Sequence, residues 1–354
     1  MKNKIMLISM ANGSDHQRYV RVLANGLKDE YDVDVVCSQY TSAELKKVNG
    51  IKVYEVCTPH KSRISFNMIS PVAMWKLSRF LRRERPGIIH YMNAHPYNII
   101  INMLSGMNKK IFSLHDVVPH PDENINAFIK IYNYIVKNIS DRLVVYSQNS
   151  FMQLGKKKSK TSILPLCGRD YERHDDDDGY ILFFGRFKPY KGLDMLSKVI
   201  EKVDDYKIKF IIAGSGEKSD YNFKFENVKV INRYMSNEEL YKLIERCRAV
   251  ILPYTSASQS GVIPLAYSFG KPIIITNIGG LMDMFIEGSG YISDVNEDDI
   301  AEKVRRMCYD NEQYSKFKNN IANMYNELYS KEKMIEKFKK FYKEIIVNEM
   351  SIYR

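Results

Sequence analysis

Residues 181–194 read ILFFGRFKPYKGLD, an apolar run followed by a glycine, three basic residues and a second glycine. The apolar run, Tyr180–Phe184, predicts a buried strand, and the amphipathic pattern of Lys191–Val203 predicts a helix after it. Gly185 allows the backbone to turn sharply where the strand ends. A buried strand that leads through a tight turn into a helix is typical of parallel sheets covered by helices on both faces.

The same unit recurs along the whole chain in two series. The first series predicts strands at Lys4–Met10, Val33–Cys37, Ile88–Tyr91, Lys110–Leu114 and Arg142–Tyr146. The second predicts strands at Tyr180–Phe184, Lys207–Ala213, Val228–Ile231, Ala249–Leu252 and Pro272–Thr276. Helical patterns lie between them at Gln17–Lys28, Pro71–Arg85, Ile125–Ile139, Lys191–Val203, Ser236–Arg246 and Gly261–Phe269. We therefore expect an α/β protein of two Rossmann-like domains with parallel sheets.

The length of 354 residues also favours two domains, and an acidic segment marks their boundary. The run Asp175–Asp178 within Arg169–Gly179 is more typical of a solvated linker than of a metal site. A basic amphipathic pattern over Lys331–Tyr342 predicts a terminal helix. We expect an N-terminal domain over residues 1–165, a linker over 166–179, a C-terminal domain over 180–330 and a helix within 331–354 that packs on the body.

The composition is that of a globular protein, with 45% hydrophobic and 27% charged residues. The apolar run Ile5–Met10 is too short for the core of a signal peptide, and no window reaches the roughly 18 apolar residues of a membrane span. The five cysteines are odd in number and widely spaced, which argues against a disulfide framework and a zinc site. We expect a soluble, cytoplasmic protein with no metal centre and with buried cysteines.

The net charge of +11 is concentrated in the first half of the chain. Residues 1–165 contain 24 Lys and Arg against 12 Asp and Glu, a net +12, whereas the remainder contains 29 against 30, a net −1. Such asymmetry indicates a negatively charged partner, either a membrane surface or a nucleic acid. The predicted helix Pro71–Arg85, with Trp75 and four arginines, suits anionic lipid headgroups, although it also fits an ordinary helix with a solvated basic rim. The chain contains no recognised nucleic-acid-binding module, so we expect no nucleic acid.

Two segments suit phosphate binding because ligands of open parallel sheets bind where the strands end. In the segment after the predicted strand Tyr180–Phe184, Arg186 offers a planar fork of hydrogen-bond donors, and Lys191 offers a point charge beside the start of a helix. The second segment, SQSGVIPLA at residues 258–266, would present the backbone N–H groups of Ser260, Gly261 and Val262 to an anion. The simpler interpretation of the first segment is two surface cations after a strand. The simpler interpretation of the second is a helix that is capped by a serine and binds no ligand.

Three stretches resemble a known family: GRFKPYKGLD at 185–194, AGSG at 213–216 and SQSGVIPLAYSFGKPIIITNIGG at 258–280. They are similar to the retaining glycosyltransferases with the GT-B fold, the group often called glycosyltransferase family 4. The resemblance is close over residues 180–290 and looser over the rest of the chain. It implies two Rossmann-like domains that face a central cleft, with the acceptor on the N-terminal domain and the nucleotide sugar on the C-terminal domain.

The resemblance also implies roles for single residues. Arg186 and Lys191 match the cations that hold the donor diphosphate, next to Gly185. His115, followed by Asp116, matches a histidine near the transferred sugar. The other implied donor contacts are Gly13 in a glycine-bearing loop, Arg233 and Tyr234 in the nucleobase region, and Ser258, Gln259, Ser260, Gly261 and Val262 in the second loop.

The chain departs from the family pattern at two positions. Members usually carry two glutamates eight positions apart in the second loop, and the corresponding residues here are Ala257 and Leu265. No acidic residue lies anywhere from Ala249 to Met282. Either Ser258, Gln259 and backbone groups replace the carboxylates, or the donor is held differently, or catalysis is lost.

Histidines offer further candidates for contact with a substrate. The chain has seven, and a lone histidine is usually structural. His115 ranks first because it follows the predicted buried strand Lys110–Leu114 and so lies at the edge of the cleft. His16, His95 and His120 follow other strands and could face an acceptor.

We therefore expect a retaining hexosyltransferase that moves a sugar from a UDP- or GDP-linked donor to a glycan acceptor. We expect it to need no metal and no cofactor, since two cations and a helix start can neutralise a diphosphate. The resemblance further implies a lipid-linked acceptor, a place in bacterial surface polysaccharide biosynthesis such as O-antigen or capsule, and a peripheral location on the inner face of the cell membrane. The alternatives are a GT-B-fold sugar-nucleotide epimerase and a catalytically silent protein that binds nucleotide sugars.

Overall fold

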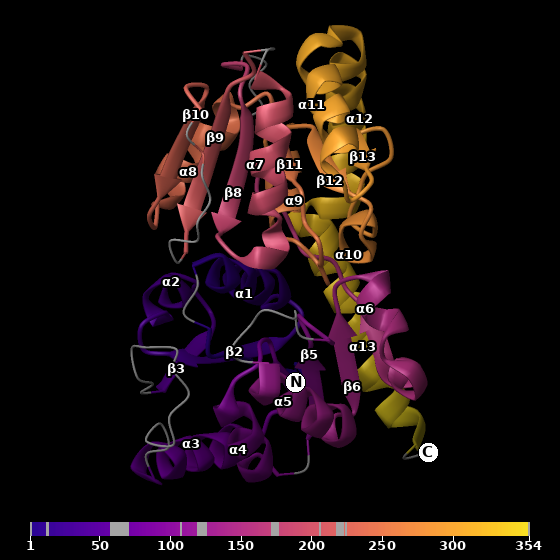
Figure 1. The fold of residues 1–354 in the computed structure, drawn as a ribbon. Helices are drawn as coiled ribbons and strands as arrows, with labels where there is room; N and C mark the ends of the chain where they lie inside the picture. Colours follow the sequence, from indigo (N-terminus) through magenta and orange to yellow (C-terminus); the bar gives the residue numbers. More distant parts are fainter. Residues whose placement is uncertain are drawn as a thin grey trace.

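The computed structural model describes residues 2–11, 14–56, 71–106, 108–118, 126–170, 177–204, 207–216, 223 and 225–352. These residues form two domains, each built on one parallel sheet, with the C-terminal domain above the N-terminal domain in Figure 1. The predicted α/β class with two parallel sheets is confirmed.

The N-terminal sheet has seven parallel strands in the order β3-β2-β1-β4-β5-β6-β7. Its strands are β1 (Lys4–Ser9), β2 (Asp32–Ser38), β3 (Lys52–Val56), β4 (Ile88–Tyr91), β5 (Lys109–Ser113), β6 (Arg142–Val145) and β7 (Thr161–Ile163). Its helices are α1 (Ser14–Leu27), α2 (Ser42–Lys46), α3 (Pro71–Glu84), α4 (Pro96–Leu104), α5 (Asn126–Ile139), α6 (Gln148–Met152) and the 3-10 helix η2 (Gly155–Lys160). The strand order reverses between β1 and β4, and ligand sites of such sheets form beyond the carboxyl ends of the strands at that point.

The C-terminal sheet has six parallel strands in the order β10-β9-β8-β11-β12-β13. Its strands are β8 (Ile181–Arg186), β9 (Phe210–Ser215), β10 (Val228–Asn232), β11 (Ala249–Leu252), β12 (Ile273–Thr276) and β13 (Gly290–Ser293). Its helices are the 3-10 turn η3 (Pro189–Lys191), α7 (Leu193–Lys202), α8 (Asn237–Arg246), α9 (Val262–Ser268), α10 (Gly279–Met282), α11 (Glu297–Tyr309) and α12 (Asn311–Tyr329). The reversal lies between β8 and β11, so the segments after these two strands border the ligand-binding edge.

Helices bury both faces of the N-terminal sheet. On one face α3, α4 and α5 contribute Leu77, Tyr97 and Tyr132 to a core with Met6 and Ile8 of β1. On the other face α1 packs together with the last helix, α13 (Lys331–Ile352). Because both faces are buried, the strands carry near-continuous apolar runs rather than alternating patterns.

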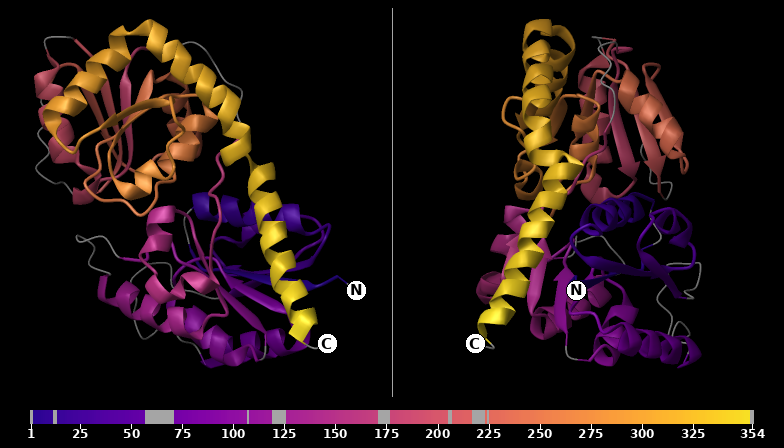
Figure 2. Two further views of the ribbon diagram at one scale, coloured as in Figure 1. Left: turned by 90° about the vertical axis from the view of Figure 1, so that its right-hand side faces the viewer. Right: turned by 180° about the vertical axis from the view of Figure 1, so that it is seen from behind.

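The terminal helix α13 leaves the C-terminal domain and runs down along the N-terminal domain (Figure 2). Its apolar stripe, which includes Met334, Phe338 and Tyr342, lies in the N-terminal core beside Ile5 and Leu7. The hydroxyl of Tyr342 lies 2.7 Å from Nδ1 of the buried His90. The chain therefore crosses between the domains twice, once through the linker and once at the start of α13.

The acidic run proved less solvated than predicted where the structure describes it. Asp177 is largely buried, and its Oδ2 accepts a hydrogen bond from the Tyr314 hydroxyl at 3.1 Å and lies 3.8 Å from Nη1 of Arg248. Asp178 pairs with Arg246. The run therefore fastens the end of the linker to the C-terminal domain.

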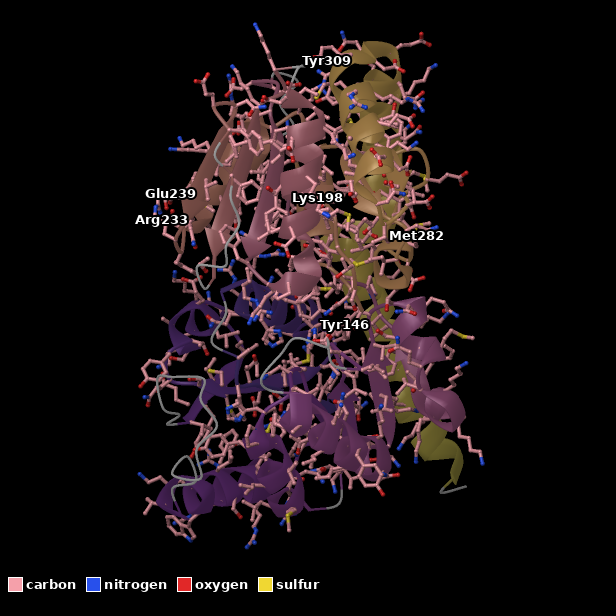
Figure 3. All side chains as sticks on the ribbon, viewed as in Figure 1. Tyr146, Lys198, Arg233, Glu239, Met282 and Tyr309 are labelled. Atoms are coloured by element: carbon pink, nitrogen blue, oxygen red, sulfur yellow. The ribbon has the colours of Figure 1, made fainter. Side chains whose placement is uncertain are left out.

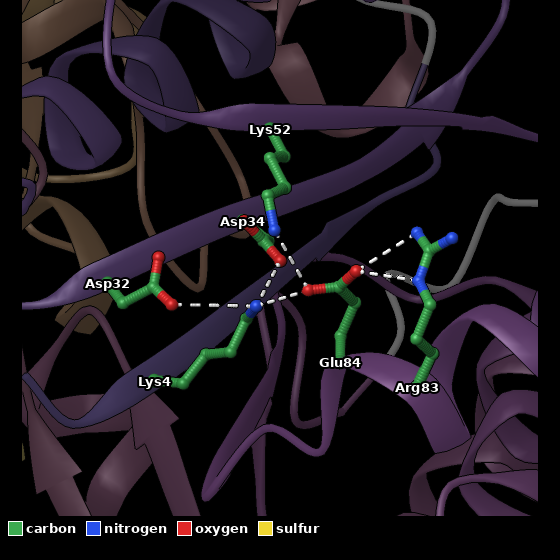
Figure 4. Close-up of polar contacts among 6 residues, drawn as sticks. All are labelled: Lys4, Asp32, Asp34, Lys52, Arg83 and Glu84. Atoms are coloured by element: carbon green, nitrogen blue, oxygen red, sulfur yellow. Dashed lines mark hydrogen bonds and ion pairs between the residues drawn. The ribbon is translucent and has the colours of Figure 1, made fainter. Parts of the chain in front are cut away.

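An ion network joins the first three strands to the end of α3 (Figure 4). The Lys4 ammonium contacts Glu84 and lies 2.9 Å from Asp34, and Glu84 also accepts from Lys52 at 3.1 Å and from Arg83 at 3.0 Å. The side chains of Asp34 and Glu84 are only 1% and 8% exposed. The hydrogen bond from Lys4 and those from Lys52 and Arg83 lower the pKa of Glu84 to about 2.

We predict that Glu84→Gln lowers the free energy of unfolding by about 1–3 kcal/mol at neutral pH, because the Lys4 ammonium loses a charged partner. The pKa of Glu84 is depressed on folding, so its contribution is present above the ordinary carboxyl pKa of 4.5 and is lost as the pH falls toward about 2. Urea titrations at several pH values measure this difference. A matched control is Glu30→Gln, since Glu30 pairs with Lys339 at an exposed site. A loss that stays constant from neutral to strongly acidic pH would contradict the role of the charge.

Candidate functional site

A hollow of about 660 Å³ lies between the two domains at the carboxyl ends of their strands. The described residues that line it include five cations and two histidines but neither Asp nor Glu. These charged and titratable residues are Arg18, Arg169, Arg186, Lys191, Arg233, His16 and His115. Such a concentration of positive charge without a carboxylate suits an anionic ligand.

The segment after β8 supplies two of the predicted cations. Gly185 has a φ of +135°, which L-residues with a side chain rarely adopt, and a Cβ there would lie 3.9 Å from Nζ of Lys191. Arg186 ends the strand with an exposed side chain at the mouth of the hollow. Nζ of Lys191 donates a 2.6 Å hydrogen bond to the Tyr254 hydroxyl and lies 4.0 Å from the centre of that ring. The two cations therefore border the same part of the hollow.

The Lys191 ammonium is held in a position that costs free energy in the ligand-free chain. Burial lowers its pKa from 10.5 to about 8 and the neighbouring Arg186 acts in the same direction, whereas Tyr190 and Asp116 act against the shift. A nearby anion would compensate for both effects, because it favours the charged form of the lysine. The lowered pKa therefore indicates that the negative charge already nearby compensates for only part of the cost of burial.

The structure corrects the predicted start of the following helix. Lys191 ends the 3-10 turn η3, and α7 begins only at Leu193. Between them Gly192 has a φ of +71°, and a Cβ there would lie 1.8 Å from the carbonyl oxygen of Pro253. The tight contact with the neighbouring loop fixes the turn. Because no α-helix begins at Lys191, the positive charge at this position comes from the lysine side chain and not from the N-terminus of a helix.

The second predicted phosphate segment differs from the expected row of three free N–H groups. The Ser260 N–H points to Sδ of Met284 at 3.2 Å, and the Val262 N–H donates to Oγ of Ser260 at 3.3 Å. Among the described residues, the Gly261 N–H has no hydrogen-bond partner, and a Cβ at Gly261 would meet no atom within 4 Å. Gly261 therefore retains the open approach that an anion requires.

Ser258 lies apart from the hollow. It is buried, and its carbonyl oxygen accepts a 2.7 Å hydrogen bond from Oγ of Ser147 on the other domain. Because of this bond, Ser258 lies in the contact between the domains, and it is not among the residues that line the hollow.

His115 and Gln259 connect the domains beside the hollow. Nε2 of Gln259 donates to Nδ1 of His115 at 3.0 Å, and Nε2 of His115 lies 3.0 Å from the carbonyl oxygen of Met92. This pattern fixes a neutral ring with the proton on Nε2. Burial lowers the pKa of His115, and its ring stacks on Tyr146, which lies at the junction of the domains (Figure 3). Asp116 is not among the residues around the hollow, and its carbonyl oxygen accepts from Asn133.

His16, which the sequence ranked behind His115, also lines the hollow. Its ring lies edge-on to that of His115, with the ring centres 5.7 Å apart. Burial lowers the pKa of His16 to about 3, so the ring is neutral at physiological pH. Within the described parts of the chain, Nε2 of His16 and Oε1 of Gln259 are buried without a hydrogen-bond partner. Both atoms are available to polar groups of a ligand.

One further histidine candidate, His95, is not among the residues that line the hollow. His95 caps α4 by accepting from the Tyr97 N–H, so it has a structural role. His120 and Gly13 lie outside the described residues.

The loop after β10 forms the outer end of the hollow. Nη2 of Arg233 lies 2.6 Å from Oε1 of Glu239, and the pair sits at the edge of the C-terminal domain (Figure 3). Tyr234 is 77% exposed. The structure thus brings both predicted nucleobase residues to the hollow, next to Met235 and Leu240.

Sequence reasoning missed two of the five cations. Arg18 lies in the first half of α1 and Arg169 in the linker, so neither stands directly at the end of a strand. The Arg169 guanidinium lies 4.5 Å from the centre of the Tyr241 ring. Only the approach of the two domains brings these residues to the site, and no local pattern signals it.

The positions of the missing glutamates border this site. Leu265 lines the hollow and Ala257 is buried beside it. Among the described residues, no three His, Cys, Asp or Glu side chains gather in a way that could hold a metal ion. In the same residues, no helix has the length and apolar content needed to cross a bilayer.

Comparisons with known proteins identify relatives of both halves. The family model described as Glycosyl transferase 4-like matches residues 4–149, and the model described as Glycosyl transferases group 1 matches residues 169–324. An uncharacterized glycosyltransferase of Methanocaldococcus jannaschii is 24% identical over 336 residues, covering 91% of this chain and 93% of the relative. The O-antigen chain mannosyltransferase C of Escherichia coli is 21% identical over 304 residues, covering 78% and 81%. The solved structure of Anabaena Alr3699/HepE in complex with UDP-glucose is 14% identical, has a TM-score of 0.76, and the match covers 96% of this chain and 99% of that one.

We predict that Lys191→Met raises the free energy of unfolding of the ligand-free chain by about 1 kcal/mol at neutral pH, since it removes a desolvated charge. The pKa of Lys191 is lowered on folding, so its cost is fully present below about 8 and disappears as the pH rises toward 10.5. Thermal or urea unfolding across this range measures the difference. The control Lys198→Met alters a lysine that is 63% exposed on α7 and should change stability by less than about 0.5 kcal/mol. A destabilised Lys191→Met variant would show that the ammonium is already compensated.

Proposed function

The chain belongs to the glycosyltransferases of the group 1 and 4-like type with the GT-B fold, and on this premise we propose that it is a retaining, metal-independent hexosyltransferase. It takes a sugar from a UDP- or GDP-linked donor and transfers it to a glycan acceptor. The observation that carries the proposal is the interdomain hollow, whose described lining has five cations and no carboxylate. The relatives support this direction, since one is an O-antigen chain mannosyltransferase and one structural neighbour was solved in complex with UDP-glucose.

The diphosphate of the donor lies between Arg186, Lys191 and the Gly261 N–H in this proposal. When the bond between the sugar C1 and the phosphate oxygen breaks, its electron pair remains on the diphosphate. The two cations therefore stabilise the transition state more than the bound donor, which is the condition for faster chemistry. Because their charges suffice for this neutralisation, the proposed reaction requires no metal ion.

The sugar lies at the other end, next to His16, His115 and Gln259. The buried Nε2 of His16 and Oε1 of Gln259 lack partners among the described residues and can accept hydrogen bonds from sugar hydroxyls. They take the place of the two carboxylates that the family usually supplies. The acceptor oxygen forms the new bond to C1 on the face that the diphosphate leaves, and the proton of its hydroxyl passes to the departing phosphate.

We also propose that the acceptor is lipid-linked, that the product is a bacterial surface polysaccharide, and that the cytoplasmic enzyme docks on anionic lipid. The outer sides of α3, α4 and α5 expose the large apolar residues Val72, Trp75, Met103, Ile131 and Tyr134. Arg79 lies 5.6 Å from the Trp75 ring, and Lys76 and Arg82 are exposed on the same helix. Apolar side chains among cations suit the boundary between headgroups and acyl chains. In Figure 1, α3 and α4 lie at the end of the N-terminal domain that is remote from the C-terminal domain.

For catalysis, we expect Arg186→Ala and Lys191→Ala each to lower the rate of sugar transfer by about 10²–10³-fold, because each removes positive charge at the leaving group. Initial rates with UDP- and GDP-sugars and a glycan acceptor measure the effect, and Lys198→Ala on α7 serves as the control. Near-normal transfer by both variants refutes the mechanism. Turnover of the donor without any acceptor would instead indicate an epimerase, and nucleotide binding without turnover a silent binding protein.

For membrane docking, we expect the protein to sediment with vesicles that contain phosphatidylglycerol at low salt and to be released at high salt. Trp75→Ala combined with Arg79→Ala should reduce the partition coefficient about tenfold, since an apolar anchor and about 1 kcal/mol of charge attraction are lost. The control Tyr309→Ala alters an equally exposed aromatic residue on α11 of the C-terminal domain (Figure 3). Failure of the unaltered protein to bind these vesicles, or equal loss in the control, removes the membrane from the proposal.

A further inference from the structure

A second hollow, of about 310 Å³, lies where the two chain crossings meet between the domains. We call it the hinge hollow. It is lined by four cations, Arg18, Arg21, Arg169 and Lys331, and by a single carboxylate, Asp170. Its walls thus come from α1 of the N-terminal domain, from the linker and from the first residue of α13.

Two of the four cations of the hinge hollow are paired with carboxylates. Lys331 pairs with Asp170, and Nη1 of Arg21 lies 2.9 Å from the exposed Glu44. Arg18 donates a long 3.4 Å hydrogen bond to the carbonyl oxygen of Cys167, and its Nε is buried without a partner among the described residues. A buried guanidinium N–H without an acceptor is costly, so the arrangement favours the arrival of an anion.

The hinge hollow shares a wall with the donor hollow but has cations of its own. Arg18, Gly168 and Arg169 line both spaces. Arg21 and Lys331 line only the hinge hollow, whereas Arg186 and Lys191 line only the donor hollow. The two spaces can therefore be altered independently by mutation.

We propose that the hinge hollow is a second anion site, which binds a phosphate or diphosphate group distinct from the donor diphosphate. Guanidinium groups bind phosphate oxygens through paired N–H donors, and three arginines from two segments converge here. A phosphate in this position contacts α1, the linker and α13 together, so it links the N-terminal domain to both crossings. Two of these arginines, Arg18 and Arg169, also line the donor hollow, but anion binding here does not depend on the proposed transfer reaction.

The test uses pyrophosphate and isothermal titration calorimetry on the full chain. The unaltered protein should bind two pyrophosphates, and Arg186→Ala with Lys191→Ala should bind one. Adding Arg21→Ala and Lys331→Ala to that variant should weaken the remaining binding at least tenfold. On the otherwise unaltered chain, Arg21→Ala with Lys331→Ala should leave the affinity for nucleoside diphosphates unchanged.

A gain-of-affinity variant guards against effects of misfolding. Asp170→Asn removes the one carboxylate of the hinge hollow, so it should tighten the second pyrophosphate site several-fold. Lys340→Ala, an exposed lysine on the same helix as Lys331, is the control and should change nothing. The proposal is overturned if only one pyrophosphate binds to the unaltered chain, if Asp170→Asn has no effect, or if the Arg21 and Lys331 changes weaken nucleotide binding equally.

A second probe identifies the source of the phosphate. Farnesyl diphosphate that binds the second site more tightly than pyrophosphate would support the diphosphate of a lipid-linked acceptor as the ligand. Equal affinities would support a soluble phosphate or diphosphate. Because this test measures binding alone, it can succeed when sugar transfer fails, and the failure of either proposal is recognised separately.

Discussion

The central constraint on this molecule is that like charges from distant parts of the chain are held around one space. Strands of a parallel sheet all end at the same edge, and the segments that leave these edges in the two domains face each other. Arg186 and Lys191 come from one domain and Arg18 from the other, and the described lining contains no carboxylate. Arg186 and burial both disfavour the charge on Lys191, so the packing of both cores must hold these side chains in place. The depressed pKa of Lys191 is the clearest sign of this cost.

Part of this packing comes from α13, which connects the two domains. This helix follows α12 of the C-terminal domain but buries Met334, Phe338 and Tyr342 in the N-terminal core. It joins the domains together with the linker and with hydrogen bonds from Ser147 to Ser258, from Gln259 to His115 and from the Asn149 N–H to Asp283. These polar contacts lie beside the ligand site, whereas the apolar stripe of α13 belongs to the N-terminal core. The domains are therefore joined by two separate features, a polar contact next to the hollow and an apolar attachment through α13.

The sequence predicts the central strands of both sheets but misses several of their edge strands. All ten predicted strands exist, because strands buried on both faces carry apolar runs that stand out. The three strands that were missed, β3, β7 and β13, all lie at sheet edges, where short or half-exposed strands lose this signal. The candidate site shows a similar difference between residues that follow buried strands and residues that do not. Arg186, Lys191 and Gly261 follow buried strands and were predicted, whereas Arg18 and Arg169 reach the hollow only through the arrangement of the two domains, which local sequence does not encode.

The two ends of the hollow differ in charge, and they therefore stabilise different parts of the transition state. A glycosyl transfer separates charge, with positive charge on the sugar ring and negative charge on the leaving diphosphate. A carboxylate beside the sugar would stabilise the first and a cation beside the diphosphate the second. Here Ala257 and Leu265 stand where carboxylates would act, and the nearest polar groups, His16 and Gln259, are neutral. Stabilisation must therefore come mainly from the diphosphate end. Neutral acceptors at the sugar end can still orient hydroxyl groups, because a hydrogen bond needs a lone pair and not a charge.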